Sequence, residues 1–237
     1  MKTIGLLGGM SWESSVEYYR IINEEVKRRL GGLHSARCLL WSFDFAEIEA
    51  LQMAGDWDAA ARRMVDAALS LERGGADGIV ICTNTMHKLA PQVQSAISIP
   101  ILHIADTTAR RIQSDGLERI GLLGTRFTME QDFYKGRLVQ NFGLTVLTPD
   151  SDGRRIIHDV IYDELCLGEV RDESRRHYLR IMDDLVAAGA QGVILGCTEI
   201  TLLIKPEHTT IPLYDTTYLH ALAAVDWALE ADTLSLR

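Results

Sequence analysis

Two stretches of this chain end in side chains that can exchange a proton with a bound molecule. Residues 75–85 and 189–199 share one pattern, a short aliphatic run typical of a buried strand that closes with small polar residues. When the stretches are aligned, Cys197 matches Thr83, and Cys82 is one residue out of step. Because side chains alternate across a strand, Cys82 is expected to face away from whatever Thr83 faces. The pair to explain is therefore one thiol and one hydroxyl.

Two such groups on opposite sides of a bound molecule suit inversion at a carbon centre, since one removes a proton from one face and the other returns a proton to the opposite face. A thiol has an ordinary pKa of about 8.5. A position between a strand end and a helix N-terminus is expected to lower the pKa of Cys197 towards ambient pH. The amides and hydroxyls of Asn84, Thr85 and Thr198 are expected where orphan helix donors collect, so they could hold a carboxylate without a basic side chain.

The chain that must position these groups alternates strands with connectors of helix length. Residues 3–7 predict a buried strand, and residues 8–11 predict a turn from which a helix starts; Gly31-Gly32 ends that helix. The apolar residues at spacings of three and four, expected to form its buried face, are Val16, Tyr19, Ile22, Val26 and Leu30. Four strand-helix units in succession imply a parallel sheet covered on both faces.

The second half of the sequence repeats the order of the first. Residues 119–125 match residues 3–9, and Tyr134 matches Tyr18 in the helix that follows. An Ile-Pro pair followed by Asp-Thr-Thr also occurs twice, at 99–100 with 106–108 and at 211–212 with 215–217. The first Asp-Thr-Thr predicts a helix N-cap at Asp106. Several matched landmarks in one order indicate an internal duplication.

We therefore expect an α/β protein of two pseudo-symmetric lobes, each a mainly parallel sheet covered by helices, with the active site in the cleft between them. The first lobe is expected over residues 1–110 and the second over 111–215, with a helix at 216–237 packing back on the first. Ligands of open α/β sheets bind at the carboxyl ends of the strands. The residues expected to line the cleft are 10–14, 83–85, 125–128 and 197–199, which makes Glu199 a substrate-binding candidate.

Composition excludes several classes of protein. The chain of 237 residues is 47% hydrophobic and 24% charged, which supports a large core, and its net charge of −9 without a basic cluster argues against nucleic acid and anionic membranes as partners. There is no apolar run of about 18 residues, so we expect a soluble, cytoplasmic protein. The four cysteines and seven histidines lack metal-ligand spacing, so no metal site is expected. The dinucleotide motif G-x-G-x-x-G is absent after the first strand.

Three motifs together resemble one family: Gly-Leu-Leu-Gly-Gly-Met-Ser at 5–11, Thr-Asn-Thr-Met-His at 83–87, and Gly-Cys-Thr-Glu at 196–199. Over essentially its whole length the chain resembles the aspartate/glutamate racemases, which racemise amino acids without pyridoxal phosphate and use two cysteines as opposed acid and base. The resemblance implies that Cys197 is one catalytic residue, that Thr83 occupies the position of the other, and that no cofactor is needed. By the same resemblance, the residues that approach the substrate are Met10, Asn84, Thr85, Thr125, Thr128 and Thr198.

Thr83 departs from the family pattern, in which Cys-Asn-Thr-x-His stands at this place. The combination of threonine and cysteine looks like that of enterobacterial members described as L-aspartate/glutamate-specific racemases. In the two-cysteine relatives the second cysteine works on the L face, so Cys197 is expected to abstract the proton from the L-enantiomer. A hydroxyl is a far poorer acid and base than a thiol, and Thr83 is therefore expected to be the slow partner.

A second departure from the family pattern concerns the residues that bind the substrate's side chain. Archaeal aspartate racemases use an arginine and a lysine for the distal carboxylate, whereas residues 44–52 and 164–168 offer no cation at the matching place. Gln52 could donate a hydrogen bond to a carboxylate or to an uncharged polar group. The leading hypothesis is racemisation of L-aspartate and L-glutamate by a homodimer, which the resemblance suggests. The alternatives are a broad-specificity amino-acid racemase, a single-thiol decarboxylase of the same superfamily, and a binding protein that senses an amino acid.

Less specific roles compete with these assignments. Thr83 could be no more than a helix cap. His87, one helical turn further on, could either orient the loop or touch the substrate. The remaining cysteines are expected to be packing residues: Cys38, Cys82 and Cys166.

Overall fold

The computed structural model describes residues 1–230 and consists of two compact units. One unit comprises Met1–His103 together with residues 220–230, and the other comprises Ile104–Leu219. The chain thus divides after residues 103 and 219, where the sequence indicated 110 and 215. Residues 231–237, part of the helix expected over 216–237, lie outside the described residues. Among the described residues, no helix is both long and apolar enough to cross a membrane.

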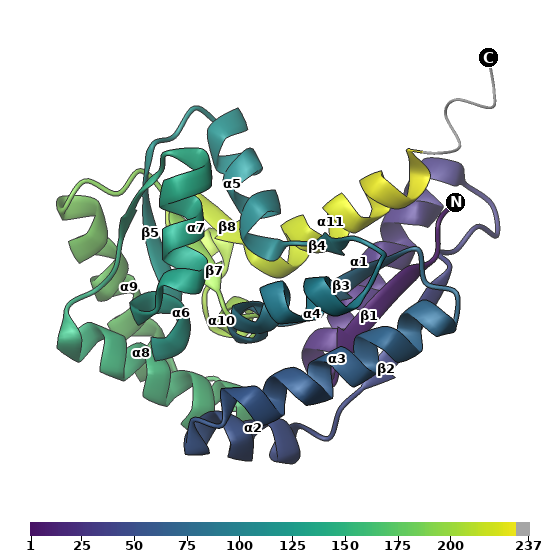
Figure 1. Cartoon of the computed structure of the whole chain (residues 1–237). Helices are drawn as coiled ribbons and strands as arrows, with labels where there is room; N and C mark the ends of the chain where they lie inside the picture. Colours follow the sequence, from purple (N-terminus) through teal and green to yellow (C-terminus); the bar gives the residue numbers. More distant parts are fainter. Residues whose placement is uncertain (231–237) are drawn as a thin grey trace. The chain divides into compact units, whose positions relative to one another are not determined.

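The first unit is built on a parallel sheet of four strands in the order β2-β1-β3-β4 (Figure 1). The central strands β1 (Ile4–Gly8) and β3 (Gly78–Ile81) are buried along their whole length, and β2 (Cys38–Ser42) and β4 (Ile101–Leu102) form the edges. Parallel neighbours need crossover connections, which are helical here. The helices of this unit are α1 (Trp12–Leu30), α2 (Phe45–Ala54), α3 (Trp57–Arg73), the 3₁₀ helix η1 (Thr85–Leu89), α4 (Ala90–Ala96) and most of α11 (Thr216–Leu229).

Alternation along β1 and β3 builds a separate core on each face of this sheet. Leu7, Ile79 and Ile81 pack against residues of α3 and α4. Leu6 and Val80 point to the other face, where they pack with residues of α1 and α11. Both faces are thus covered by helices, as the nearly continuous apolar strands predicted.

The second unit repeats this design with a parallel sheet in the order β6-β5-β7-β8. Its strands are β5 (Arg119–Gly124), β6 (Thr145–Leu147), β7 (Val193–Gly196) and β8 (Leu213–Asp215). Its helices are α5 (Ile104–Ser114), α6 (Arg126–Glu130), α7 (Asp132–Phe142), α8 (Ser151–Asp163), η2 (Leu165–Leu167), α9 (Asp172–Ala187), α10 (Ile200–Leu203) and η3 (Pro206–His208). The predicted fold class, two α/β units each with a parallel sheet covered by helices, is confirmed.

Strand register shows that the two sheets are copies of one arrangement. Gly5 pairs with Ile79 in the first sheet, and Gly121 pairs with Val193 at the matching place in the second. Even a side-chain contact is repeated, because the backbone N–H of Thr3 donates to the Asp77 carboxylate (2.6 Å) and that of Arg119 donates to the Gln191 side chain (2.9 Å). The structure therefore supports the alignment that matches Thr83 with Cys197.

The buried face of α1 differs from the predicted one. The helix begins after the N-cap Ser11 and ends at Gly31, whose φ of 74° suits glycine. Of the five apolar residues expected inside, Ile22 and Val26 are buried, whereas Val16, Tyr19 and Leu30 are exposed at 51%, 54% and 44%. The helix is rotated so that Tyr18 and Ile21 complete the buried face.

A buried hydrogen bond explains this rotation. The Tyr18 hydroxyl contacts Nδ1 of His220 on α11 (2.8 Å), and Nε2 of the same ring contacts the carbonyl of Leu102 (2.8 Å). A carbonyl only accepts, so Nε2 carries the proton, and in the neutral ring Nδ1 accepts from Tyr18. The bond joins α1, α11 and the end of β4 in one unit.

Tyr18→Phe is expected to lower the free energy of unfolding by about 1–3 kcal/mol, because His220 Nδ1 would be left buried without its donor. Tyr134→Phe is the matched control. Tyr134 is the equivalent buried tyrosine on α7, and its hydroxyl, which lies near the Thr108 side chain, makes no hydrogen bond of ordinary geometry among the described residues. Urea denaturation of both variants measures the difference. Equal losses in the two variants would show that the hydroxyl–imidazole bond does not stabilise the unit.

The N-cap predicted at Asp106 is wrong. Helix α5 begins at Ile104, so Asp106 lies in its first turn, where its carboxylate forms a bidentate ion pair with Arg137 of α7. Strand pairing explains the error: Ile79 pairs with Ile101 and Val193 pairs with Leu213, which aligns Asp215 with His103 and not with Asp106. Asp215 itself does cap α11, since its Oδ1 accepts from the backbone N–H groups of Thr217 (2.9 Å) and Tyr218 (3.1 Å).

Candidate active site

The turn after β1 is shaped by Gly9 and by buried serines. Gly9 has a φ of +80°, and a Cβ at this position would lie 2.3 Å from the backbone N and O of Phe43, so only glycine fits. Its N–H donates to Ser15 Oγ (2.7 Å), which in turn donates to the carbonyl of Ser11 (3.1 Å). The Met10 side chain is buried and belongs to the core that α3 and α4 cover. The polar groups of this turn are thus held at the carboxyl end of the sheet.

The turn after β3 carries three of the predicted site residues. Cys82 is fully buried in the core with α1 and α11, Thr83 is half-buried, and Asn84 and Thr85 are buried. His87, on η1, contacts the carbonyl oxygen of Thr83 through Nδ1 (2.7 Å). This contact favours an orienting role for His87.

Gln52, on α2, reaches the same turn. Its Nε2 donates to the sulfur of Met86 at 3.0 Å, and the side chain is buried. The first unit therefore brings Gln52 close to the residues that follow Thr83, although the two segments lie about thirty residues apart in the sequence.

The turn after β7 holds the thiol. Cys197 is half-buried, and its Sγ donates to Oε2 of Glu199, a buried carboxylate, at 2.9 Å. Thr198 lies between them and is half-buried. The sequence interpretation placed Glu199 only against substrate; the structure makes it the hydrogen-bond acceptor of the thiol. A carboxylate two residues after a cysteine at a strand end is the signal that could have indicated this.

Thr125 and Thr128 lie beside this turn. Thr125 is the N-cap of α6: its Oγ1 accepts from the backbone N–H of Thr128 (3.4 Å), and the two hydroxyl oxygens are 3.3 Å apart. A Cβ built on Gly196 would lie 3.4 Å from Cγ2 of Thr128, which places this methyl group against the strand end that carries Cys197. The second unit thus brings Thr125, Thr128 and the Cys197 turn together.

The pKa expected for Cys197 is wrong in direction. Burial is the largest cause that raises it well above the ordinary thiol value, and the negative charge of Glu199 raises it further. The helix that follows, α10, has only four residues, too few to offset these effects with its dipole. The resting side chain is therefore a protonated thiol that donates to a carboxylate, and its deprotonation requires a nearby proton acceptor.

The other cysteines behave as the packing interpretation predicts. Burial raises the pKa of Cys38 to about 11 and that of Cys82 higher still, so neither is a ready thiolate at neutral pH. Cys166 packs against the core of the second unit, to which Cys197 also belongs. Among the described residues, no group of three or more His, Cys, Asp and Glu side chains could hold a metal ion.

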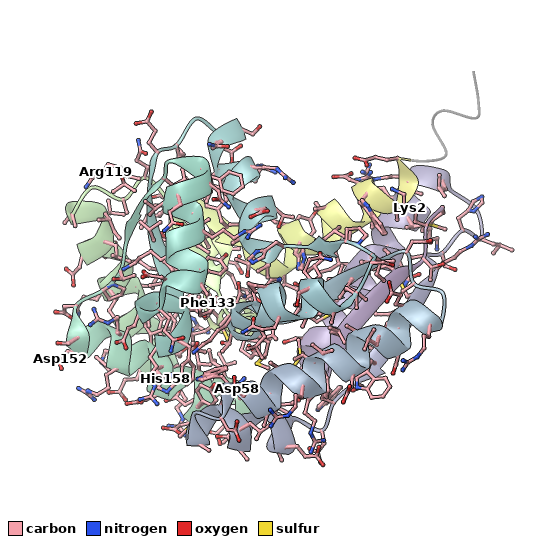
Figure 2. All side chains as sticks on the ribbon, viewed as in Figure 1. Lys2, Asp58, Arg119, Phe133, Asp152 and His158 are labelled. Carbon is pink, nitrogen blue, oxygen red and sulfur yellow. The ribbon has the colours of Figure 1, made fainter. Side chains whose placement is uncertain are left out.

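A cation and a histidine near Thr125 were missed by the sequence interpretation. Arg126 opens α6, and its backbone N–H donates to Nδ1 of His158 on α8 (3.4 Å). His158 is labelled in Figure 2. The His158 ring stacks at a tilt on Tyr162, with ring centroids 4.8 Å apart. Burial, followed by the charge of Arg126, lowers the pKa of His158 and favours the neutral ring. Nothing in the spacing of residues 125–162 indicated this contact.

The two units carry copies of one parallel sheet, and at the same register each sheet is followed by a side chain able to exchange a proton. This arrangement defines a duplicated α/β protein. The family described as Asp/Glu/Hydantoin racemase matches residues 7–224. The chain belongs to that family, which confirms the resemblance and the assignment as an enzyme.

Similar structures and a curated relative agree with this membership. A crystal structure from Yersinia pestis, assigned to the Asp/Glu racemases, is 54% identical with a TM-score of 0.91, covering 97% of this chain and 100% of that one. An aspartate racemase homologue from Pyrococcus horikoshii OT3 is 31% identical with a TM-score of 0.82, covering 96% and 99%. The broad specificity amino-acid racemase RacX of Bacillus subtilis (strain 168) is 24% identical over 177 residues, 72% of this chain and 73% of RacX.

Proposed function

We propose that this enzyme racemises L-aspartate and L-glutamate without a cofactor, by two-base proton transfer at the α-carbon. The observation that carries the proposal is the Cys197 thiol donating to the buried Glu199 carboxylate, at the register position that Thr83 occupies in the other unit. The mechanism requires both turns to approach one substrate molecule from opposite sides. The catalytic residues are then Cys197 and Thr83.

Glu199 gives the thiol a route to the thiolate. In the L-to-D direction, the thiol proton passes to the Glu199 carboxylate, and the thiolate then removes the α-proton to leave a planar carbanion. Thr83 delivers a proton to the other face and recovers one from solvent, and Glu199 releases to solvent the proton that it took from the thiol. Burial makes the unpaired thiolate costly, so the transfer to Glu199 is coupled to abstraction.

The substrate-binding part of the proposal uses hydroxyls and amides. The α-carboxylate is bound by Asn84, Thr85 and Thr198, with the Thr125–Thr128 pair and the Met10 turn completing the site. Gln52 donates to the substrate's side chain. Arg126, one residue after Thr125, adds a positive charge that supports an acidic substrate. The expectation of a cytoplasmic homodimer is part of the same proposal, and the exposed Val16 and Tyr19 of α1 are compatible with a partner surface.

A broad-specificity amino-acid racemase is the second candidate. RacX, described by that specificity, is similar over 72% of this chain. Gln52 is compatible with either an uncharged polar side chain or a carboxylate. The test must therefore use a panel of substrates.

Proton NMR in deuterium oxide with a panel of L- and D-amino acids is expected to show solvent exchange of the α-hydrogen before inversion for the L-isomer only. The reason is that Cys197 exchanges its proton readily, whereas Thr83 transfers slowly. Since the equilibrium constant between enantiomers is one, kcat/KM must still be equal in both directions. The amino acids that exchange identify the substrate.

Three outcomes would contradict this proposal. If deuterium entered the D-isomer before inversion, the assignment of Cys197 to the L face would be wrong. Binding of an L-amino acid without any exchange would favour a binding protein. Release of carbon dioxide from a disubstituted malonate, without amino-acid exchange, would favour a single-thiol decarboxylase in which Thr83 is a bystander.

A further inference from the structure

The carbonyl of Thr83 accepts a hydrogen bond from an imidazole, whereas the carbonyl of Cys197 accepts one from a backbone N–H. The 3₁₀ helix η1 uses the backbone N–H of His87 for the carbonyl of Asn84 (3.1 Å). The backbone N–H of His87 therefore does not bond the carbonyl of Thr83. The His87 ring bonds this carbonyl instead, through Nδ1 at 2.7 Å. Because a carbonyl only accepts, Nδ1 carries the proton.

The matching turn in the second unit provides an internal comparison. Thr201 occupies the position of His87, and its N–H bonds the carbonyl of Thr198 (3.3 Å), just as His87 N–H bonds that of Asn84. The carbonyl of Cys197, however, accepts from the backbone N–H of Ile200 (3.2 Å). The backbone turn is therefore duplicated, but the Thr83 carbonyl accepts from a side chain, that of His87, whereas the Cys197 carbonyl accepts from a backbone N–H.

The His87 ring is itself held in place by other aromatic rings of the same unit. It is 1% exposed, and its centroid lies 4.6 Å from that of His103 and 5.6 Å from that of His220. The His220 ring is bonded on both sides, to Tyr18 and to Leu102. A buried ring packed against a doubly bonded one has little freedom, so it can fix the carbonyl to which it donates.

We propose that His87 is a positioning residue that aligns Thr83 for proton transfer to the D face. The inference rests on the proposed function. A hydroxyl is a poor acid, so its transfer depends on alignment more strongly than that of a thiol, and a misplacement of about 1 Å can cost about 10²-fold in rate. His87 does not touch the reacting atoms in this proposal; it acts through the Thr83 backbone.

Two amide substitutions separate this role from a merely structural one. In His87→Asn, the amide nitrogen takes the place of Nδ1 and keeps the bond to the Thr83 carbonyl. In His87→Gln, the longer side chain carries its amide nearer the position of Nε2, and the bond is lost. Both variants remove the ring and stay polar, so general damage to the buried cluster affects both, and melting temperatures report that damage independently.

The experiment measures deuterium exchange into the L-isomer and inversion to the D-isomer in the same NMR sample. His87→Gln is expected to slow inversion by about 10- to 100-fold, while L-exchange, which needs Cys197 and Glu199 but not Thr83, stays within about three-fold of the unmodified enzyme. His87→Asn is expected to restore most of the inversion rate.

Equal slowing of exchange and inversion in His87→Gln, or equal inversion rates in the two variants, would overturn the positioning role. The proposed function would survive that outcome as long as the unmodified enzyme exchanges and inverts the L-substrate. Conversely, absence of exchange in the unmodified enzyme would reject the proposed function before His87 is tested.

Discussion

Cys197→Ser is expected to lose both L-exchange and inversion, each by at least about 10³-fold. The variant leaves hydroxyls at both catalytic positions, and a serine hydroxyl cannot give its proton to Glu199 at a useful rate. Because the thiol is half-buried and the replacement is slightly smaller, the fold is expected to persist. NMR in deuterium oxide measures both rates, and circular dichroism checks the fold.

Thr83→Cys is the complementary variant, and it places thiols at both positions. Turnover is expected to rise, because a thiol is a better acid than the hydroxyl that limits inversion. The excess of L-exchange over inversion should shrink in the same variant.

Exchange that survives in Cys197→Ser would contradict the assignment of Cys197 to the L face.

Glu199→Gln is expected to lower the rate of L-exchange while making the Cys197 thiol easier to ionise. L-exchange should fall by about 10²-fold, because the amide cannot accept the thiol proton. The pKa of Cys197 should fall as well, since the negative charge of Glu199 is one of the causes that raise it. Burial still holds that pKa above the ordinary thiol value. A variant that is more reactive as a thiolate yet less active as an enzyme is the expected signature.

Alkylation by iodoacetamide across a pH series, with the modified peptide of Cys197 identified by mass spectrometry, measures the ionisation of the thiol. Reaction requires the thiolate, so the rate rises with pH through the thiol pKa. The midpoint should move to lower pH in Glu199→Gln. Glu207→Gln, which removes an exposed carboxylate on η3 of the same unit, is the control and should leave the midpoint in place. A midpoint that rises, or exchange that is unaffected, would show that Glu199 does not act on the thiol.

Much of the fold follows from local features. The glycines and small polar residues that close β1, β3, β5 and β7 mark the strand ends, and the matched runs predict two copies of one sheet. Ser11 and Gly31 predict the ends of α1, because caps are formed by the residues next to the helix itself. The alignment of Thr83 with Cys197 could be predicted for the same reason, since strand register repeats wherever the apolar pattern repeats.

Contacts between elements distant in the sequence decided the rest. Val16 and Tyr19 have the spacing of a buried face, yet α1 turns Tyr18 inward because its hydroxyl meets His220, about two hundred residues further along the chain.

The amino-acid sequence by itself determined the two sheets, their shared register and the matching positions of Cys197 and Thr83. Only the tertiary structure decided which carboxylate accepts the hydrogen bond of the Cys197 thiol, which ring donates to the Thr83 carbonyl and where α5 begins. A strand and its turn depend on neighbouring residues. The surroundings of Cys197 and His87, by contrast, depend on which elements the fold brings around them. The pKa of Cys197 rises because its burial outweighs the dipole of a four-residue helix.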